Sequence, residues 1–164
     1  MPERTAHVSQ PLTSELARRW KLEVDTADSA VSPTWVPVRG IGEFTDKQDD
    51  KMQDDTDYDS DGYGSETKTL INWSNELTLV TKTNATTGVL DAGQAKLKAA
   101  RRQFGEAGTV HIRWYDRNGV VGDAWEGWAS VGWDPQGGSA DDLDKVKVTL
   151  RGQGAPIAIT NPAA

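Results

Sequence analysis

Hydrophobic and polar residues alternate along several short stretches of this chain, with the period of two that is typical of half-buried β-strands. In the stretch 20–26, Trp20, Leu22 and Val24 alternate with charged side chains. The pair Asn118-Gly119 separates two such stretches and favours the tight turn of a β-hairpin. The pattern predicts strands at 20–26, 34–44, 67–84, 109–116, 120–133 and 144–154. Pro37 cannot donate a ladder hydrogen bond, which places its strand at an edge or a bulge.

One segment repeats its apolar residues with the spacing of an α-helix. Leu97 and Phe104 fall on one face of 90–104, while Asp91 can cap the first turn, with Gln94 three residues later. We therefore expect one helix at 90–104. Its exposed side and its C-terminal half, where cations suit the helix dipole, carry a candidate basic docking face of Lys96, Lys98, Arg101 and Arg102.

Two segments show neither the strand period of two nor the spacing of an α-helix. Residues 1–19 are polar and are expected to form a flexible N-terminal arm. Residues 45–66 have almost no large aliphatic side chains, so we expect one long acidic loop, of the kind that is typically functional or disordered. The remaining pattern predicts a mainly β (α+β) fold, an antiparallel β-sandwich or partly closed barrel over 20–154 with one flanking helix. A C-terminal tail at 155–164 follows and could add a short strand.

Length and composition narrow the class of protein. The chain has 164 residues, enough for a single domain with its own core. It contains no cysteine, which excludes disulfides, thiol nucleophiles and thiolate metal ligands. No apolar run is long enough for a membrane-spanning helix, and the first ten residues lack the apolar core of a signal peptide. Synthesis in the cytosol is therefore expected.

The net charge of −7 is concentrated in one place. Residues 46–66 carry nine acidic and two basic side chains, whereas the rest of the chain carries 16 of each sign. A sequence-specific nucleic-acid reader needs a basic face, and a neutral body with one acidic segment does not provide it. The acidic segment is thus the most distinctive feature of the composition.

The run DDTDYDSDGYG, residues 54–64, resembles the first half of a calcium-binding loop. Asp57, Asp59 and Asp61 occupy ligand positions 1, 3 and 5, and Gly62 occupies position 6. Position 12, where a bidentate glutamate is needed, is Lys68. The three aspartates are kept as an alternative metal site, but a solvated acidic loop is the favoured interpretation.

Residues suited to catalysis are scarce. His7 lies in the arm and His111 is expected at an outward-facing strand position, and the motifs of serine hydrolases, zinc proteases and phosphate-binding loops do not occur. Asp123 and Glu126 lie on a tryptophan-rich hairpin, a loose pattern for a carbohydrate site, although tryptophans there are more often core or subunit-contact residues. We expect neither an enzyme nor a cofactor.

Four features, taken in order, resemble the tail tube protein (major tail protein) of long-tailed, lambda-like bacteriophages. They are WVPVRGIGEF leading into an acidic loop, DDTDYDSDGYGSETKT re-entering a strand, the helix at 90–104, and the pair YDRNGVVGDAWEGWASVG and DKVKVTLRG. Together they span about residues 20–152. The additional immunoglobulin-like domain of some family members does not occur in this sequence.

The resemblance implies a structural protein of the virion, assembled in the host cytoplasm without any membrane. Family members form hexameric rings that stack into a tube around the tape measure protein, and viral DNA later passes down the lumen without specific binding. The long loop contacts a neighbouring subunit or the next ring. That implies a subunit-interface loop here, made by Asp54, Asp55, Asp57, Tyr58, Asp59, Asp61 and Tyr63.

Elementary electrostatics suits this interpretation. A neutral or negative tube wall does not hold phosphates, and the acidic loop can dock on the basic helix face of a neighbour. A head-to-tail contact gives rings and stacks, whereas a two-fold contact gives only dimers. Two alternatives stay open: a β-sandwich module that binds calcium or carbohydrate, and a related tail terminator or connector protein.

Overall fold

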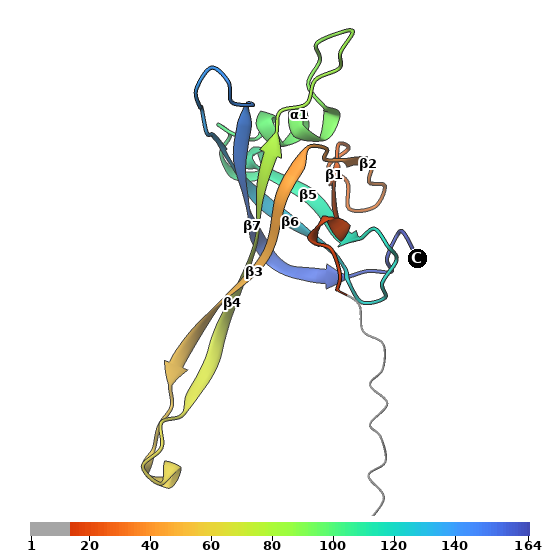
Figure 1. Ribbon diagram of the computed structural model, residues 1–164. Helices are drawn as coiled ribbons and strands as arrows, with labels where there is room; N and C mark the ends of the chain where they lie inside the picture. The colour runs from red at the N-terminus through yellow and green to blue at the C-terminus, as the bar shows by residue number, and fades with distance from the viewer. Residues whose placement is uncertain (1–13) are drawn as a thin grey trace, which may run out of the picture.

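The computed structural model describes residues 14–164, which form one antiparallel sheet with a helix at one end (Figure 1). The strand order is β2-β1-β5-β6-β7-β4-β3. The strands are β1 (Trp20–Asp25), β2 (Trp35–Pro37), β3 (Ile41–Asp54), β4 (Glu66–Val80), β5 (Thr109–Asp116), β6 (Ala124–Pro135) and β7 (Lys145–Ala158). The helix is α1 (Ala92–Ala99), and short 3-10 turns occur at η1 (Ala17–Arg19), η2 (Tyr58–Ser60) and η3 (Gly105–Gly108).

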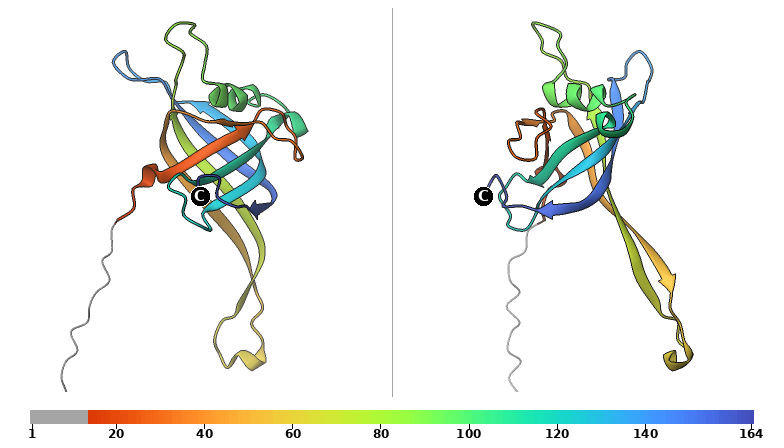
Figure 2. Two further views of the ribbon diagram at one scale, coloured as in Figure 1. Left: turned by 90° about the vertical axis from the view of Figure 1, so that its right-hand side faces the viewer. Right: turned by 180° about the vertical axis from the view of Figure 1, so that it is seen from behind.

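The sheet is strongly curved, so its concave face encloses a single apolar core that α1 covers at one end (Figure 2). Because side chains alternate between the faces of a strand, β1 gives Leu22 and Val24 to this core, and β5 gives Val110 and Ile112. The helix packs against β1, β2 and β6 and inserts Leu97. The curl does not close, because β2 and β3 are left as edges. The expected mainly β fold with one flanking helix is confirmed.

The strand predicted at 34–44 is two strands. β2 ends at Pro37 and β3 begins at Ile41, because the chain turns at Gly40, where φ is 80°. A side chain at Gly40 would meet the carbonyl oxygen of Val80, so the turn lies tight against β4. The edge position predicted for Pro37 is confirmed.

The prediction of one long loop at 45–66 is wrong for most of its length. β3 continues to Asp54 and pairs with β4 down to Glu66, so only 55–65 connect the two strands. The error has a physical cause, since strand periodicity appears only where one face is buried. Both faces of the outer hairpin are exposed, and most of its side chains are polar, apart from the exposed apolar residues Met52, Leu70 and Ile71.

The predicted helix at 90–104 is too long, although its start is confirmed. Asp91 caps α1 by accepting a hydrogen bond from the backbone N–H of Gln94, but the helix ends at Ala99. The backbone then leaves the helical path, and Phe104 is 95% exposed instead of facing the core. Of the four candidate basic residues, only Lys96 and Lys98 lie in the helix.

The chain ends also differ from the expectation. Part of the predicted tail at 155–164 belongs to β7, because Ile157 and Ala158 pair with β6. Within the predicted arm at 1–19, the last residues form η1 and lead directly into β1, and Arg19 binds Asp116 and Asp123. Residues 1–13 of that arm lie outside the described residues.

Candidate assembly surfaces

The outer half of the β3–β4 hairpin leaves the body of the molecule as a two-stranded arm (Figure 1). Pairing between β3 and β4 runs from Ile41–Leu79 to Asp54–Glu66, but β4 pairs with β7 only from Ser74 onward. Beyond that point each strand has only the other as a neighbour in the described residues. An isolated two-stranded hairpin is marginally stable in water, so an arm of this length is suited to packing on a partner.

Trp73 lies in the fork where β4 separates from β7. Its indole N–H donates to the carbonyl oxygen of Gly154 at 2.7 Å, and its ring stacks on Trp114 with 5.0 Å between centroids. The ring also covers Gly152 and Gly127, which have no side chains to obstruct it. Trp73 therefore fixes the base from which the arm projects.

The tip of the arm, residues 55–65, has a defined hydrogen-bonded structure. The carboxylate of Asp57 accepts from the N–H of Asp59 at 3.0 Å and from the hydroxyl of Ser60 at 3.0 Å, which caps η2. Asp61 then turns the chain with a positive φ of 52°. All seven predicted interface residues lie at this tip or where β3 ends, and Tyr58 and Tyr63 are among its exposed side chains.

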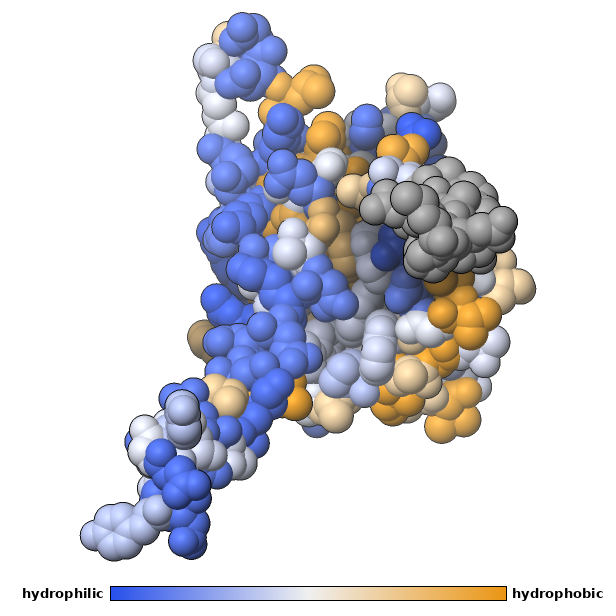
Figure 3. All heavy atoms as spheres, turned by 60° about the horizontal axis from the view of Figure 1, so that its bottom comes forward, coloured by the Kyte–Doolittle hydropathy of each residue, from blue (hydrophilic) through white to orange (hydrophobic). Residues whose placement is uncertain are grey.

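The surface of the arm differs from that of the body. Seen from the tip end, the hairpin is almost entirely hydrophilic, and the larger hydrophobic areas gather on the body (Figure 3). The nearest lysine of β4, Lys68, does not neutralise the acidic side chains of the tip. It forms an ion pair with Asp50 at 2.7 Å, closer to the base of the arm. The tip thus combines negative charge with two displayed aromatic rings.

The alternative metal site of Asp57, Asp59 and Asp61 gains no support from this geometry. Asp57 uses its carboxylate to cap its own turn, and Lys68, at the twelfth position, faces Asp50. Across residues 14–164, no group of three or more histidine or acidic side chains converges on a point that could hold a metal ion.

The candidate basic residues lie at the opposite end of the molecule from the tip, on and after α1 (Figures 1 and 2). They do not form one face. Lys96 binds Asp28 at 2.7 Å, while Lys98, Arg101 and Arg102 are exposed. The three exposed residues remain available to a partner.

A basic pocket of about 590 Å³, which the sequence did not predict, adjoins α1 at this same end. Arg39 and Lys82 line it, together with the apolar side chains of Val89 and Leu90. Asp91 also lines it, but its carboxylate is occupied by the N–H groups of Arg39 and Gln94. No spacing in the sequence links residue 39 to residues 82–92, so only the fold brings the pocket together.

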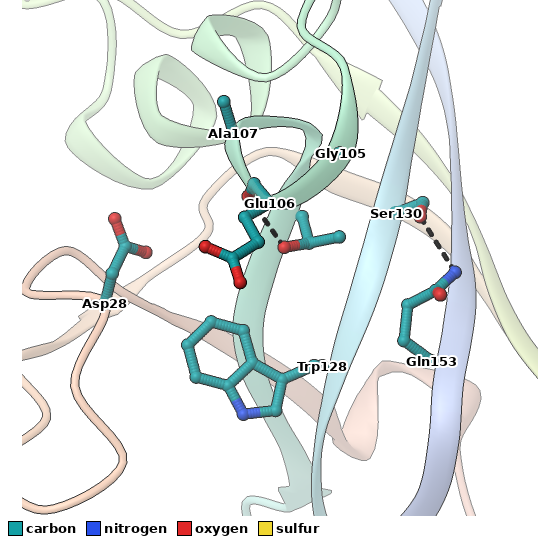
Figure 4. Close-up of a pocket in the computed structure, with 8 residues that line it drawn as sticks. Asp28, Gly105, Glu106, Ala107, Trp128, Ser130 and Gln153 are labelled. Atoms are coloured by element: carbon teal, nitrogen blue, oxygen red, sulfur yellow. Dashed lines mark hydrogen bonds between the residues drawn. The ribbon is translucent and has the colours of Figure 1, made fainter.

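A second, larger pocket of about 810 Å³ bears on the carbohydrate interpretation (Figure 4). The indole of Trp128 lies below Glu106, with Asp28 to one side and Ser130 and Gln153 on the other. One face of Trp128 is already stacked on His111, at 4.7 Å between centroids. The two carboxylates suggested from the sequence do not line this pocket. Asp123 forms an ion pair with Arg19, and a carboxylate oxygen of Glu126 lies 2.6 Å from Nε2 of His111.

His111 lies on the convex side of the sheet, as expected for an outward-facing strand position, but it is buried there and only 2% exposed. Its Nε2 lies 2.6 Å from Glu126 and its Nδ1 lies 3.3 Å from Asp25, while the rings of Trp35 and Trp128 flank it. Burial acts to raise the pKa of Asp25, but three backbone N–H groups and His111 hold that pKa below its ordinary value. The cluster joins β1, β5 and β6 on the convex side of the sheet, and no sequence pattern beyond strand parity predicts it.

No protein-family model and no curated protein matches the sequence. Within residues 14–164, no helix is both long and apolar enough to cross a bilayer. The fold, by contrast, is similar to chains of several solved assemblies.

The first is a chain in the tail of an empty gene transfer agent particle, refined with C6 symmetry. It has a TM-score of 0.68 at 12% identity, over 89% of this chain and 99% of that one. A chain of the SPP1 tail tube has a TM-score of 0.63 at 15% identity, over 89% and 80%. A chain of the extended sheath–tube complex of an extracellular contractile injection system has a TM-score of 0.56 at 11% identity, over 93% and 95%. The chain therefore shares the fold of proteins from the gene transfer agent tail, the SPP1 tail tube and a contractile injection system.

Proposed function

We propose that this chain is the structural subunit of a tail tube, which self-assembles into rings that stack into the conduit for genome delivery from a virion. One observation carries the proposal: a hairpin arm leaves a compact body, pairs with no third strand of the described residues beyond Ser74, and ends in an acidic, aromatic tip. The likeness to tail and injection-system chains supports it.

The stacking contact is head to tail. The acidic tip and the basic residues Lys98, Arg101 and Arg102 lie at opposite ends of one subunit, so subunits in the same orientation bring unlike charges together. A contact between different surfaces of identical subunits generates rings or open stacks. The C6 symmetry of the gene transfer agent tail supports six subunits in each ring.

The remaining partners follow from the role of a conduit. The tape measure protein occupies the lumen during assembly, and DNA passes through it afterwards without specific binding. The balanced charge of the chain outside residues 46–66 supports this, because a wall without excess positive charge does not retain phosphates. The subunit acts by shape and charge and needs no cofactor or catalytic group.

Negative-stain electron microscopy of the concentrated protein tests the proposal. We expect rings that stack into tubes of uniform width. Rings that never stack would instead indicate the terminator or connector role, and protein that stays monomeric at high concentration would overturn the proposal. Calcium, added to the same sample, is expected to leave both the assemblies and the thermal midpoint unchanged, unlike the behaviour of a calcium-binding module.

A further inference from the structure

The two ends of the subunit are complementary in shape as well as in charge, because one end displays an aromatic side chain and the other end has a pocket. We propose that Tyr58, at the acidic tip of one subunit, inserts into the basic pocket of Arg39, Lys82, Val89 and Leu90 on a subunit of the next ring. This inference rests on the proposed function and names the site on the partner copy.

Tyr58 has the properties of an interface anchor. Its side chain is fully exposed and contacts nothing else in the described chain that would explain so large an aromatic ring there. Tyrosines that fill pockets at the centre of an interface are among the residues that dominate binding energy. The capped turn of Asp57 and Ser60 holds Tyr58 on a defined structure, which reduces the entropy lost when the tip docks.

The pocket has the matching chemistry. Val89 and Leu90 offer apolar surface to an aromatic ring, while Arg39 and Lys82 offer cations to the acidic residues on both sides of Tyr58. Neither cation has a salt-bridge partner among residues 14–164. An arginine or lysine beside the ring adds cation–π attraction.

The pocket fits the tip better than the face that the sequence suggested. Lys96 of that face is already paired with Asp28. The apolar residue that follows the three exposed cations in the sequence, Phe104, is itself 95% exposed. The pocket by α1, in contrast, is an open depression in which a ring can lie against Val89 and Leu90 with Arg39 and Lys82 beside it.

Cysteine cross-linking tests the contact directly, because the chain has no cysteine of its own. Tyr58→Cys combined with Val89→Cys is expected to form disulfides between copies, giving a ladder of multimers on a non-reducing gel. Tyr58→Cys with Phe104→Cys is the matched control, since Phe104 is also exposed and lies at the alternative basic face. Tubes that cross-link through Phe104, or through neither position, would overturn the inference while leaving the tube function intact. Wild-type protein that forms no assembly under the same conditions would overturn both.

A charge reversal gives an independent test that does not depend on disulfide geometry. Asp59 is suitable because its carboxylate, unlike that of Asp57, makes no hydrogen bond within the tip. Asp59→Lys and Arg39→Glu are each expected to raise the critical concentration for stacking by about tenfold or more, and the two together to restore it. Tyr58→Ala is expected to weaken stacking without changing the thermal midpoint of the subunit. Failure of the double variant to recover, with both singles folded, would contradict the pairing.

Discussion

Gly152 has no side chain because the ring of Trp73 occupies the space where one would be. A Cβ built on Gly152 would lie 2.1 Å from Cε2 of Trp73, which real structures do not tolerate. The same ring is held by its bond to Gly154 and by stacking on Trp114, so it cannot move aside freely. At the scale of single residues, the point where the arm leaves the body thus depends on one tryptophan and one glycine.

Gly152→Ala is therefore expected to destabilise the subunit by about 1–3 kcal/mol, the usual effect of overpacking. Gly132→Ala is the matched control, because a Cβ there would meet only Thr149, at an ordinary 3.5 Å. The control is expected to be neutral or stabilising by about 0.4–1 kcal/mol. Urea unfolding of the three proteins measures the difference, and equal stabilities would refute the role given to Trp73.

Asp116 shows how a buried carboxylate ties the start of the sheet to the β5–β6 turn. Burial acts to raise the pKa of Asp116, but the N–H of Asn118 and the guanidinium of Arg19 hold the pKa below its ordinary value. A carboxyl group whose pKa is lower in the folded state than in the unfolded state stabilises the fold. This stabilisation is fully present at pH values above the unfolded-state pKa of about 3.9, and it is lost as the pH falls through the folded-state pKa.

The wild-type subunit is thus expected to lose stability steeply below about pH 4. Asp116→Asn should lower the thermal midpoint by several degrees at pH 7 and flatten its decline in acid. Asp141→Asn, at an exposed loop position, is the control and should follow the wild type. If the thermal midpoints of Asp116→Asn and the wild type fall in parallel as the pH is lowered, the carboxylate of Asp116 does not contribute to the pH dependence of stability.

At the scale of elements, the body of the subunit does not depend on the hairpin arm for its core. None of residues 50–71 is buried, and the core cluster lies entirely outside them. The body provides its own stability through the packing of α1 on the sheet. The arm provides reach, because a strand extends about 3.3 Å per residue without any need for a second layer.

Replacing 50–71 with Asn-Gly joins Asp49 to its cross-strand partner Asn72 by a two-residue turn. The shortened subunit is expected to keep the thermal midpoint of the wild type within a few degrees and to lose stacking completely. Calorimetry and size-exclusion chromatography check the two expectations separately. Tubes formed by the shortened subunit would show that the arm is not the stacking element.

At the scale of the whole molecule, sequence patterns predicted the body better than the parts that project from it. The alternation predicts the strand at 109–116 with its observed bounds, because Val110 and Ile112 face the core while His111 and Arg113 between and after them face the other side of the sheet. The sequence of the outer hairpin predicts a loop instead, since a strand that is exposed to solvent on both faces shows no alternation of apolar and polar residues. The basic pocket could not be predicted because its two cations, Arg39 and Lys82, come from separate segments that only the folded sheet brings together.

The separation of the acidic tip from the basic pocket makes every stack chemically polar. In a tube built from such subunits, the ring at one end has unoccupied tips and the ring at the other end has unoccupied pockets. This holds for any number of rings. The factor that starts the tube and the factor that stops it must then recognise opposite surfaces, one basic and the other acidic. Under the proposed contact, a stack therefore has two chemically different ends at which subunits can be added.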